Sequence, residues 1–435
     1  MSETAPPRPA LVRAIGRWDL TAAVINGVIG SAIFGMPARL AELTGVWSPL
    51  IALVAGLGVL SIVLCFAEVA SRFQDAGGPY LYARASFGPF VGFQAGWLSF
   101  WIRAASLSAN LNVFCTYLAE LLPAAGEGRG RAVTMTLVVL LVTAVNLIGV
   151  RQATWTVNVL TVAKLLPLVL LLAVGLWRVR GDVLATQAVS QPSWTQAILL
   201  LMFAYGGFEA ALIPAGEAKD PRRDTAFALL VAMAVVSALY MLVQLVVVGL
   251  VPHVAGVRAP LADAFRALLG PAGATLASVG AMISVCGYTN GVVLQAPRLL
   301  YSMAERRELP ALFARVHPRY RTPDRAILTF AVLALALGLY GSFEWNAVLS
   351  VIVRLVTYGL TCLALPVLRA RRPQEEPGFR LHGAAVVVPV AVLTCLWLLS
   401  TRTFAQAGIL LLIMAVGAAF YFSSPRLTSA PSGAK

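Results

Sequence analysis

Glycine interrupts two long apolar segments of this chain, at residues 27–35 and again at residues 203–209. A helix interrupted in the middle of a membrane leaves backbone N–H and C=O groups without partners, and hydrocarbon cannot hydrate them. An ion or a small zwitterion can satisfy such groups, and paired interruptions in two halves of a chain mark the binding sites of transporters. We therefore expect the two interruptions to form one binding site.

Small residues at the first interruption suit an anion. Gly30, Ser31 and Ala32 let the backbone approach a ligand closely. The half-helix that follows, with Ile33 in its first turn, would direct its freed N–H groups and the positive end of its dipole toward a carboxylate. The alternative is a patch of small residues for helix packing, which is common in membranes.

The second interruption offers carbonyl groups. Gly206 and Gly207 are unfavourable in a continuous helix, by about 1 kcal/mol each relative to alanine. The carbonyls freed there, including those of Phe203 and Gly206, could accept hydrogen bonds from an ammonium group. Tyr205 and Phe208 could help Phe203 to enclose the ligand, although aromatic residues at helical spacing more often only pack.

Four ionisable residues fall at apparent mid-membrane depth, where an unpaired charge is costly: Arg103, Lys164, Glu209 and Arg354. We expect Lys164 to bind carbonyls of the first helix in place of a sodium ion, or also to gain and lose a proton; the alternative is an inert buried lysine. Glu209 is a candidate proton carrier or gate. Arg103 pairs with Glu209 or a carbonyl, or it joins Arg354 in favouring an acidic substrate side chain.

The composition places these residues in a polytopic membrane protein. The chain has 435 residues, 59% hydrophobic and only 12% charged, with a mean hydropathy of +0.82. Apolar runs predict an all-α fold of twelve transmembrane helices. The net charge of +14 does not indicate nucleic acid, because the basic residues gather in loops on the side of the N-terminus. By the positive-inside rule both termini are cytoplasmic.

The two interruptions fall in the first and sixth predicted helices, which suggests an inverted repeat of five plus five helices. We expect a cytoplasmic segment at 1–17 with no signal peptide, repeats at about 18–178 and 194–368, two peripheral helices at about 383–422, and a cytoplasmic tail at 423–435. The five cysteines are isolated and the three histidines fall in predicted loops, so no disulfide framework, metal site, cofactor or enzymatic centre is expected.

These features resemble the amino acid–polyamine–organocation (APC) superfamily, whose fold is that of the leucine transporter, with discontinuous first and sixth helices. The resemblance covers essentially the whole chain and rests on Lys164 and on residues 30–34, 77–80, 87–88, 203–209, 217–223 and 296–298. It implies that amides of Ser31, Ala32 and Ile33 hold a substrate carboxylate, and that carbonyls of Val28, Phe203 and Gly206 hold its amino group.

Four positions deserve comment in light of the resemblance. Ala32 stands where the family usually has glycine, and its methyl group narrows the space beside the ligand. Lys164 is similar to the lysine that replaces the sodium site in sodium-independent members. Glu209 matches a family glutamate implicated in proton or gate behaviour, whereas an arginine at Arg103 is not general in the family.

The sequence therefore predicts a permease of the inner membrane that carries amino acids by alternating access, coupled to protons and independent of sodium. Exchange of one amino acid for another, or for an amine, is the alternative. A polyamine carrier ranks lower, because Glu209 is the only obvious buried carboxylate. A channel would need a continuous polar lining, and a membrane-embedded enzyme would need a convergent catalytic set.

Overall fold

The structure is a computed structural model that describes residues 15–73, 77–148, 164–212, 218–371 and 377–424. Outside these residues lie most of the predicted cytoplasmic ends, 1–17 and 423–435. Residues 149–163, which include the first part of the fifth predicted span before Lys164, also lie outside them. The described part is helical, apart from loops and one isolated bridge between Ile15 and Ala218.

The α-helices are α1 (Arg17–Val28), α2 (Ala32–Gly35), α3 (Pro37–Thr44), α4 (Ser48–Ser71), α5 (Gly78–Phe87), α6 (Pro89–Ala119), α7 (Gly128–Ile148), α9 (Gly181–Ala185), α10 (Trp194–Ala204), α11 (Pro221–Leu250), α12 (Pro260–Glu305), α13 (Asp324–Tyr340), α14 (Phe343–Arg371), α15 (Ala384–Ser400) and α16 (Phe404–Ser423). Residues 164–175 are also helical. Short 3-10 helices are η1 (Gly45–Trp47), η2 (Pro123–Ala125), η3 (Leu176–Arg178), η4 (Phe208–Leu212) and η6 (Ala311–Ala314).

Proline and glycine set the bounds of the long helices. α11 begins with Pro221 after Asp220, whose carboxylate accepts a hydrogen bond from the N–H of Arg223 at 3.4 Å. α12 also begins with a proline and bends at Gly270, whose φ of +68° is followed by Pro271.

Seven described helical segments are long and apolar enough to cross a membrane. This agrees with a multi-pass membrane protein, and the count of twelve and the inverted repeat stay predictions. The other predicted spans are not among these seven segments, for physical reasons. The sixth is interrupted after the 11 residues of α10, α13 and α15 have 17 residues each, and part of the fifth lies outside the described residues. α6 has 31 residues and is long enough, but its polar side chains make it less apolar than the seven.

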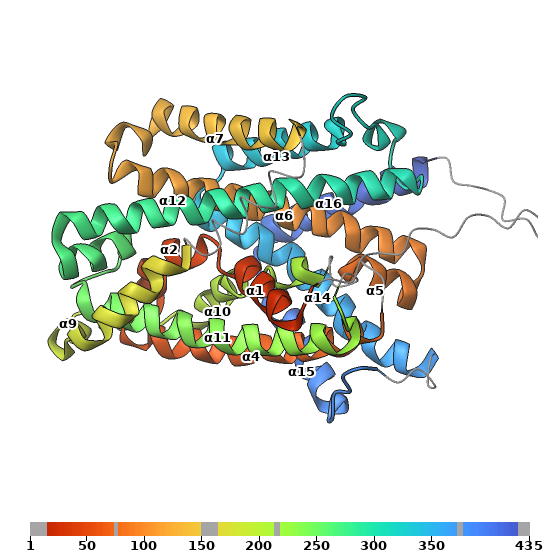
Figure 1. The fold of residues 1–435 in the computed structure, drawn as a ribbon. Helices are drawn as coiled ribbons and strands as arrows, with labels where there is room; N and C mark the ends of the chain where they lie inside the picture. The colour runs from red at the N-terminus through yellow and green to blue at the C-terminus, as the bar shows by residue number, and fades with distance from the viewer. Residues whose placement is uncertain (1–14, 74–76, 149–163, 213–217, 372–376, 425–435) are drawn as a thin grey trace, which may run out of the picture.

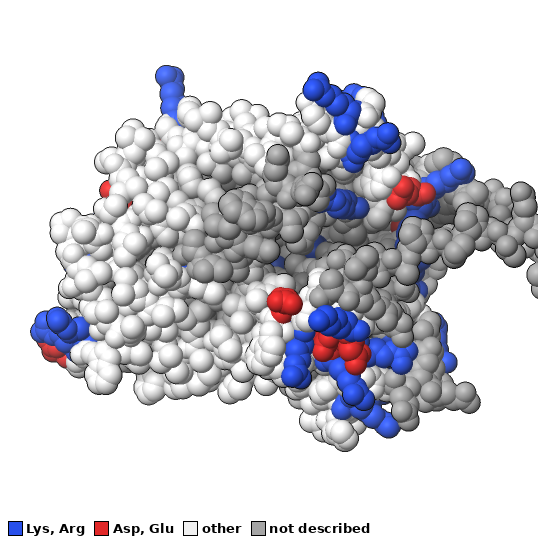
Figure 2. Space-filling model, in the orientation of Figure 1, with Lys and Arg blue, Asp and Glu red and all other residues white. Residues whose placement is uncertain are grey.

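The two interrupted segments lie at the centre of the molecule. Figure 1 shows α1 and α10 between α4 and α11 on one side and the long helices α6 and α12 on the other. Contacts join α1 to α11, and α10 to both α4 and α14. On the face in Figure 2, charged side chains gather mainly at one end, with a small group at the other, and the band between them is largely uncharged. Such a band suits a hydrocarbon environment.

Candidate functional site

Lys164 holds the first interruption open. In a continuous helix the carbonyl of Asn26 would accept the N–H of Gly30, and the carbonyl of Ile29 would accept the N–H of Ile33. Both carbonyls instead accept hydrogen bonds from Nζ of Lys164, at 2.8 Å and 2.6 Å. Gly30 turns its N–H to the carbonyl of Val28. The Lys164 side chain is buried and thus takes the place of two helical donors.

The same interruption releases N–H groups at the start of α2. Within the described part of the chain, the N–H groups of Ala32 and Ile33 have no hydrogen-bond partner, as expected for the first residues of a helix. The N–H of Ser31 donates to Oδ1 of Asn110 at 3.0 Å. The hydroxyl of Ser31 is buried and has no partner in the described residues. These groups can bind a carboxylate.

The second interruption spans Tyr205, Gly206 and Gly207, between α10 and η4. Gly207 has a φ of +107°, and a Cβ atom there would lie 2.3 Å from the carbonyl oxygen of Gly27. Glycine is therefore required both by the backbone conformation and by the close approach of the two interruptions. The N–H of Gly207 donates to the Glu209 carboxylate at 2.9 Å, so Glu209 supplies an acceptor that the broken helix lacks.

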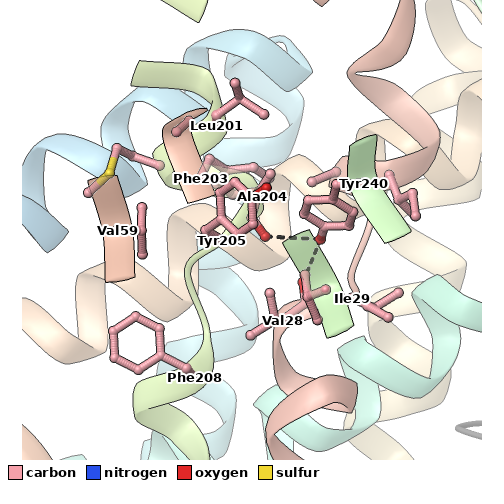
Figure 3. Packing of buried hydrophobic residues seen from close by; sticks show 14 of the residues in the cluster. Val28, Ile29, Val59, Leu201, Phe203, Ala204, Tyr205, Phe208 and Tyr240 are labelled. Atoms are coloured by element: carbon pink, nitrogen blue, oxygen red, sulfur yellow. Dashed lines mark hydrogen bonds between the residues drawn. The ribbon is translucent and has the colours of Figure 1, made fainter. Parts of the chain in front are cut away.

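Tyr240 of α11 joins the two interruptions. Its hydroxyl lies 3.1 Å from the carbonyl oxygen of Val28 and 3.0 Å from that of Ala204, the last residues of α1 and α10 (Figure 3). One hydroxyl can donate only one hydrogen, so these two carbonyls share it. A movement of α1 relative to α10 would break this arrangement.

We expect Tyr240→Phe to lower the melting temperature by a few degrees and to slow uptake several-fold, because a shared buried hydrogen bond contributes about 1 kcal/mol. Thermal unfolding and initial uptake rates in proteoliposomes measure both effects. Tyr340→Phe, at a tyrosine that is 83% exposed, is the matched control. Wild-type values in Tyr240→Phe would contradict a linking role for this hydroxyl.

Glu209 pairs with Arg354 in the structure, and no ion pair joins it to Arg103 in the described residues. Oε1 of Glu209 lies 3.3 Å from Nε of Arg354, and Oε2 accepts a hydrogen bond from the hydroxyl of Tyr358 at 2.7 Å. All three side chains are buried. Arg103 donates to the carbonyl of Ser99 at 3.1 Å, which matches the alternative of a backbone carbonyl as its partner.

Two adjoining cavities lie beside the interruptions. The smaller has a volume of about 240 Å³ and is lined by Val28, Ser31, Ala32, Asn110, Phe203 and Gly206 among others. The larger, of about 540 Å³, is lined by Asn26, Arg103, Glu209 and Gln295 among others. Both share the lining residues Gly27, Ser106, Tyr288 and Arg354. Residues of both interruptions therefore line each of these two neighbouring cavities.

The structure brings most of the predicted site residues to these cavities. Three of them line neither cavity: Ile33, Lys164 and Phe208. Ile33 borders a separate apolar cavity with Leu40 and Val243, Lys164 binds the carbonyls of Asn26 and Ile29, and Phe208 packs against Phe66 and Tyr358 at ring distances of 5.1 Å. The N–H of Ile33 is nevertheless free at the start of α2 in the described part of the chain. Among the described residues, no group of three His, Cys, Asp or Glu side chains could hold a metal ion.

Sequence reasoning missed Asn110 and Tyr240. A signal for Asn110 exists in the sequence of α6. Polar residues recur there at intervals of four, three and four residues and so mark one polar face of the helix: Ser99, Arg103, Ser106 and Asn110. No comparable signal marks Tyr240, an aromatic residue in an apolar run.

Comparisons with known proteins identify a matching family and several similar proteins. A family model described as amino acid permease matches residues 15–427. Three similar proteins come from Bacillus subtilis (strain 168). A methylthioribose transporter is 28% identical, over 95% of this chain and 93% of its own. A serine/threonine exchanger is 28% identical over 85% and 86%, and a branched-chain amino acid permease is 26% identical over 95% and 93%.

Proposed function

Because this chain belongs to the amino acid permease family, within the APC superfamily, we propose that it carries an amino acid across the cytoplasmic membrane by alternating access. The transport is coupled to protons and independent of sodium, and both termini are cytoplasmic. The observation that carries this proposal is the position of Lys164, whose ammonium group occupies the carbonyls of Asn26 and Ile29. A sodium ion would need carbonyl oxygens of this kind.

The substrate's carboxylate binds the N–H groups at the start of α2, those of Ala32 and Ile33, next to Ser31. Its amino group binds carbonyls of Val28, Phe203 and Gly206. The support for this orientation is that the N–H groups of Ala32 and Ile33 have no partner in the described residues, and that most of these residues border the smaller cavity. A zwitterion satisfies both sets at once.

Uptake by purified protein in proteoliposomes tests the proposal. We expect a labelled amino acid to accumulate when an inward proton gradient is imposed, and to do so equally when choline replaces sodium. Empty liposomes are the control. Accumulation that requires sodium, or no response to the proton gradient, would contradict the coupling.

Exchange is the second candidate, and the similarity to a serine/threonine exchanger favours it. An exchanger moves labelled substrate only when the liposomes already contain an amino acid. Loading the liposomes with unlabelled substrate, without a proton gradient, therefore separates the two mechanisms in the same assay. The internal load should be dispensable for a proton symporter.

We expect Ala32→Gly to widen the range of accepted substrates toward larger side chains. Ala32 borders the smaller cavity, and removal of its methyl group should enlarge the space beside the substrate. Some stability is lost, by up to about 1 kcal/mol, because glycine is more flexible. A competition panel of amino acids measures the range, and Ala277→Gly, at a buried alanine of α12 outside both cavities, is the control. If the same amino acids compete, in the same order of strength, as with the wild-type protein, the methyl group does not limit the size of the substrate.

A further inference from the structure

The larger cavity contains an excess of fixed positive charge. Its charged lining residues in the described part of the chain are Arg103, Glu209 and Arg354, which are two guanidinium groups and one carboxylate. Arginine keeps its charge in proteins, so the excess is permanent. The two arginines are only 7% and 3% exposed, and a buried charge of this kind is costly without an anionic partner.

Glu209 does not neutralise both arginines. Its two oxygens already accept hydrogen bonds from Nε of Arg354, the hydroxyl of Tyr358 and the N–H of Gly207. In the described part of the chain, Nη1 of Arg354 is buried without a hydrogen-bond partner. Arg103 has only the carbonyl of Ser99 as a partner there. Donors on both guanidinium groups thus remain available to an anion.

These donors border the proposed site for the substrate. Arg354 lines both cavities, and its guanidinium group packs against Gly206, where a Cβ atom would lie 1.9 Å from Nη1. The smaller cavity is lined by Ser31 and Ala32, beside the N–H groups proposed for the substrate's main-chain carboxylate. Arg354 thus lies where the two cavities adjoin, and Arg103 forms part of the wall of the larger one.

We propose that the transported amino acid has an acidic side chain, whose carboxylate is bound by Arg103 and Arg354. This inference rests on the proposed function and specifies its substrate class. The main-chain carboxylate binds the amides of the first interruption, and the side-chain carboxylate neutralises the excess charge of the larger cavity. Tyr288 and Ser106, which line both cavities, complete the surroundings of the substrate with neutral polar groups.

Competition between acids and their amides tests this inference, because each pair has nearly the same size. Uptake of labelled glutamate by the full-length protein in proteoliposomes is measured against unlabelled glutamate, glutamine, aspartate and asparagine. We expect the acids to compete at concentrations at least about tenfold lower than their amides, since hydrogen bonds to charged groups are the stronger ones. Thermal stabilisation of the purified protein by the same four compounds gives an independent readout.

Variants of Arg103 assign the preference to this residue. The preference for glutamate is the ratio of the glutamine concentration to the glutamate concentration needed for equal competition. Arg103→Gln should reduce this ratio by about tenfold, whereas Arg103→Lys, which keeps the charge, should retain most of it. Arg178→Gln, at an exposed arginine, is the control and should leave the ratio unchanged. Equal losses for the acid and the amide in Arg103→Gln would overturn the assignment and leave Arg103 a structural role.

Two failures are distinguishable in this assay. Transport of neutral amino acids without any preference for acids would overturn the inference and leave the proposed function standing; a guanidinium pair that only holds chloride would give this result. Absence of amino acid transport by wild-type protein that is folded and reconstituted would overturn the proposed function and, with it, the inference.

Discussion

Lys164→Met should reduce uptake to less than a tenth of the wild-type rate. Methionine has nearly the volume of lysine but no donor, so the carbonyls of Asn26 and Ile29 lose both hydrogen bonds from Nζ. Hydrogen bonds from charged groups contribute about 1.5–3 kcal/mol each, and 1.4 kcal/mol is already a tenfold change. We expect the first interruption to close or to shift, which moves the freed N–H groups of Ala32 and Ile33 away from the proposed carboxylate position.

Initial rates in proteoliposomes, normalised to the amount of folded protein, measure this effect. Lys219→Met is the matched control, because Lys219 is exposed and its side chain has no partner in the described residues. Uptake near the wild-type rate in Lys164→Met, under the same proton gradient, would exclude Lys164 from the mechanism. A variant that binds substrate normally but no longer responds to the proton gradient would assign Lys164 to coupling alone.

Glu209→Gln is expected to destabilise the protein by about 3–5 kcal/mol, because it leaves Arg354 buried without its carboxylate partner. Glutamine keeps the volume and can still accept from the N–H of Gly207. Arg354→Gln should be similarly harmful, since Glu209 then stays charged and unpaired. The double variant removes both charges, so it should recover part of the lost stability and uptake.

Arg103 provides the comparison for this double-mutant cycle of Glu209 and Arg354. Arg103→Gln combined with Glu209→Gln should show a smaller coupling energy, because no direct ion pair joins the two side chains in the described residues. Thermal unfolding of all single and double variants gives the coupling energies. Additive effects for Glu209 and Arg354 would mean that their ion pair contributes nothing to stability, and a larger coupling for Arg103 would make Arg103 the true partner.

Glycines and small residues predicted both interruptions, because backbone breaks depend on local residue types. The depth of Lys164 in an apolar run predicted that its side chain binds carbonyls of the first helix, and the family resemblance supported this prediction. Both inferences needed no knowledge of how the helices face one another.

The pairing of Glu209 needed that knowledge. Arg103 and Arg354 lie at the same apparent depth, and only the rotation of α6 and α14 about their axes decides which guanidinium group reaches the carboxylate. The same holds for Tyr240, which bridges two carbonyls from helices far apart in the chain. Phe208 was predicted to enclose the ligand because it lies beside the interruption in the sequence. In the structure its ring packs against Phe66 and Tyr358, outside the cavities.

The central claim is that an amino acid binds between the two interruptions while Lys164 takes the place of sodium. An experimental structure with the amino acid that most stabilises the protein, determined with sodium present, tests it most directly. We predict that the main-chain carboxylate lies about 3 Å from the N–H nitrogens of Ala32 and Ile33, with Nζ of Lys164 still on the carbonyls of Asn26 and Ile29. A sodium ion on those carbonyls, or a substrate carboxylate bound elsewhere, would contradict the claim.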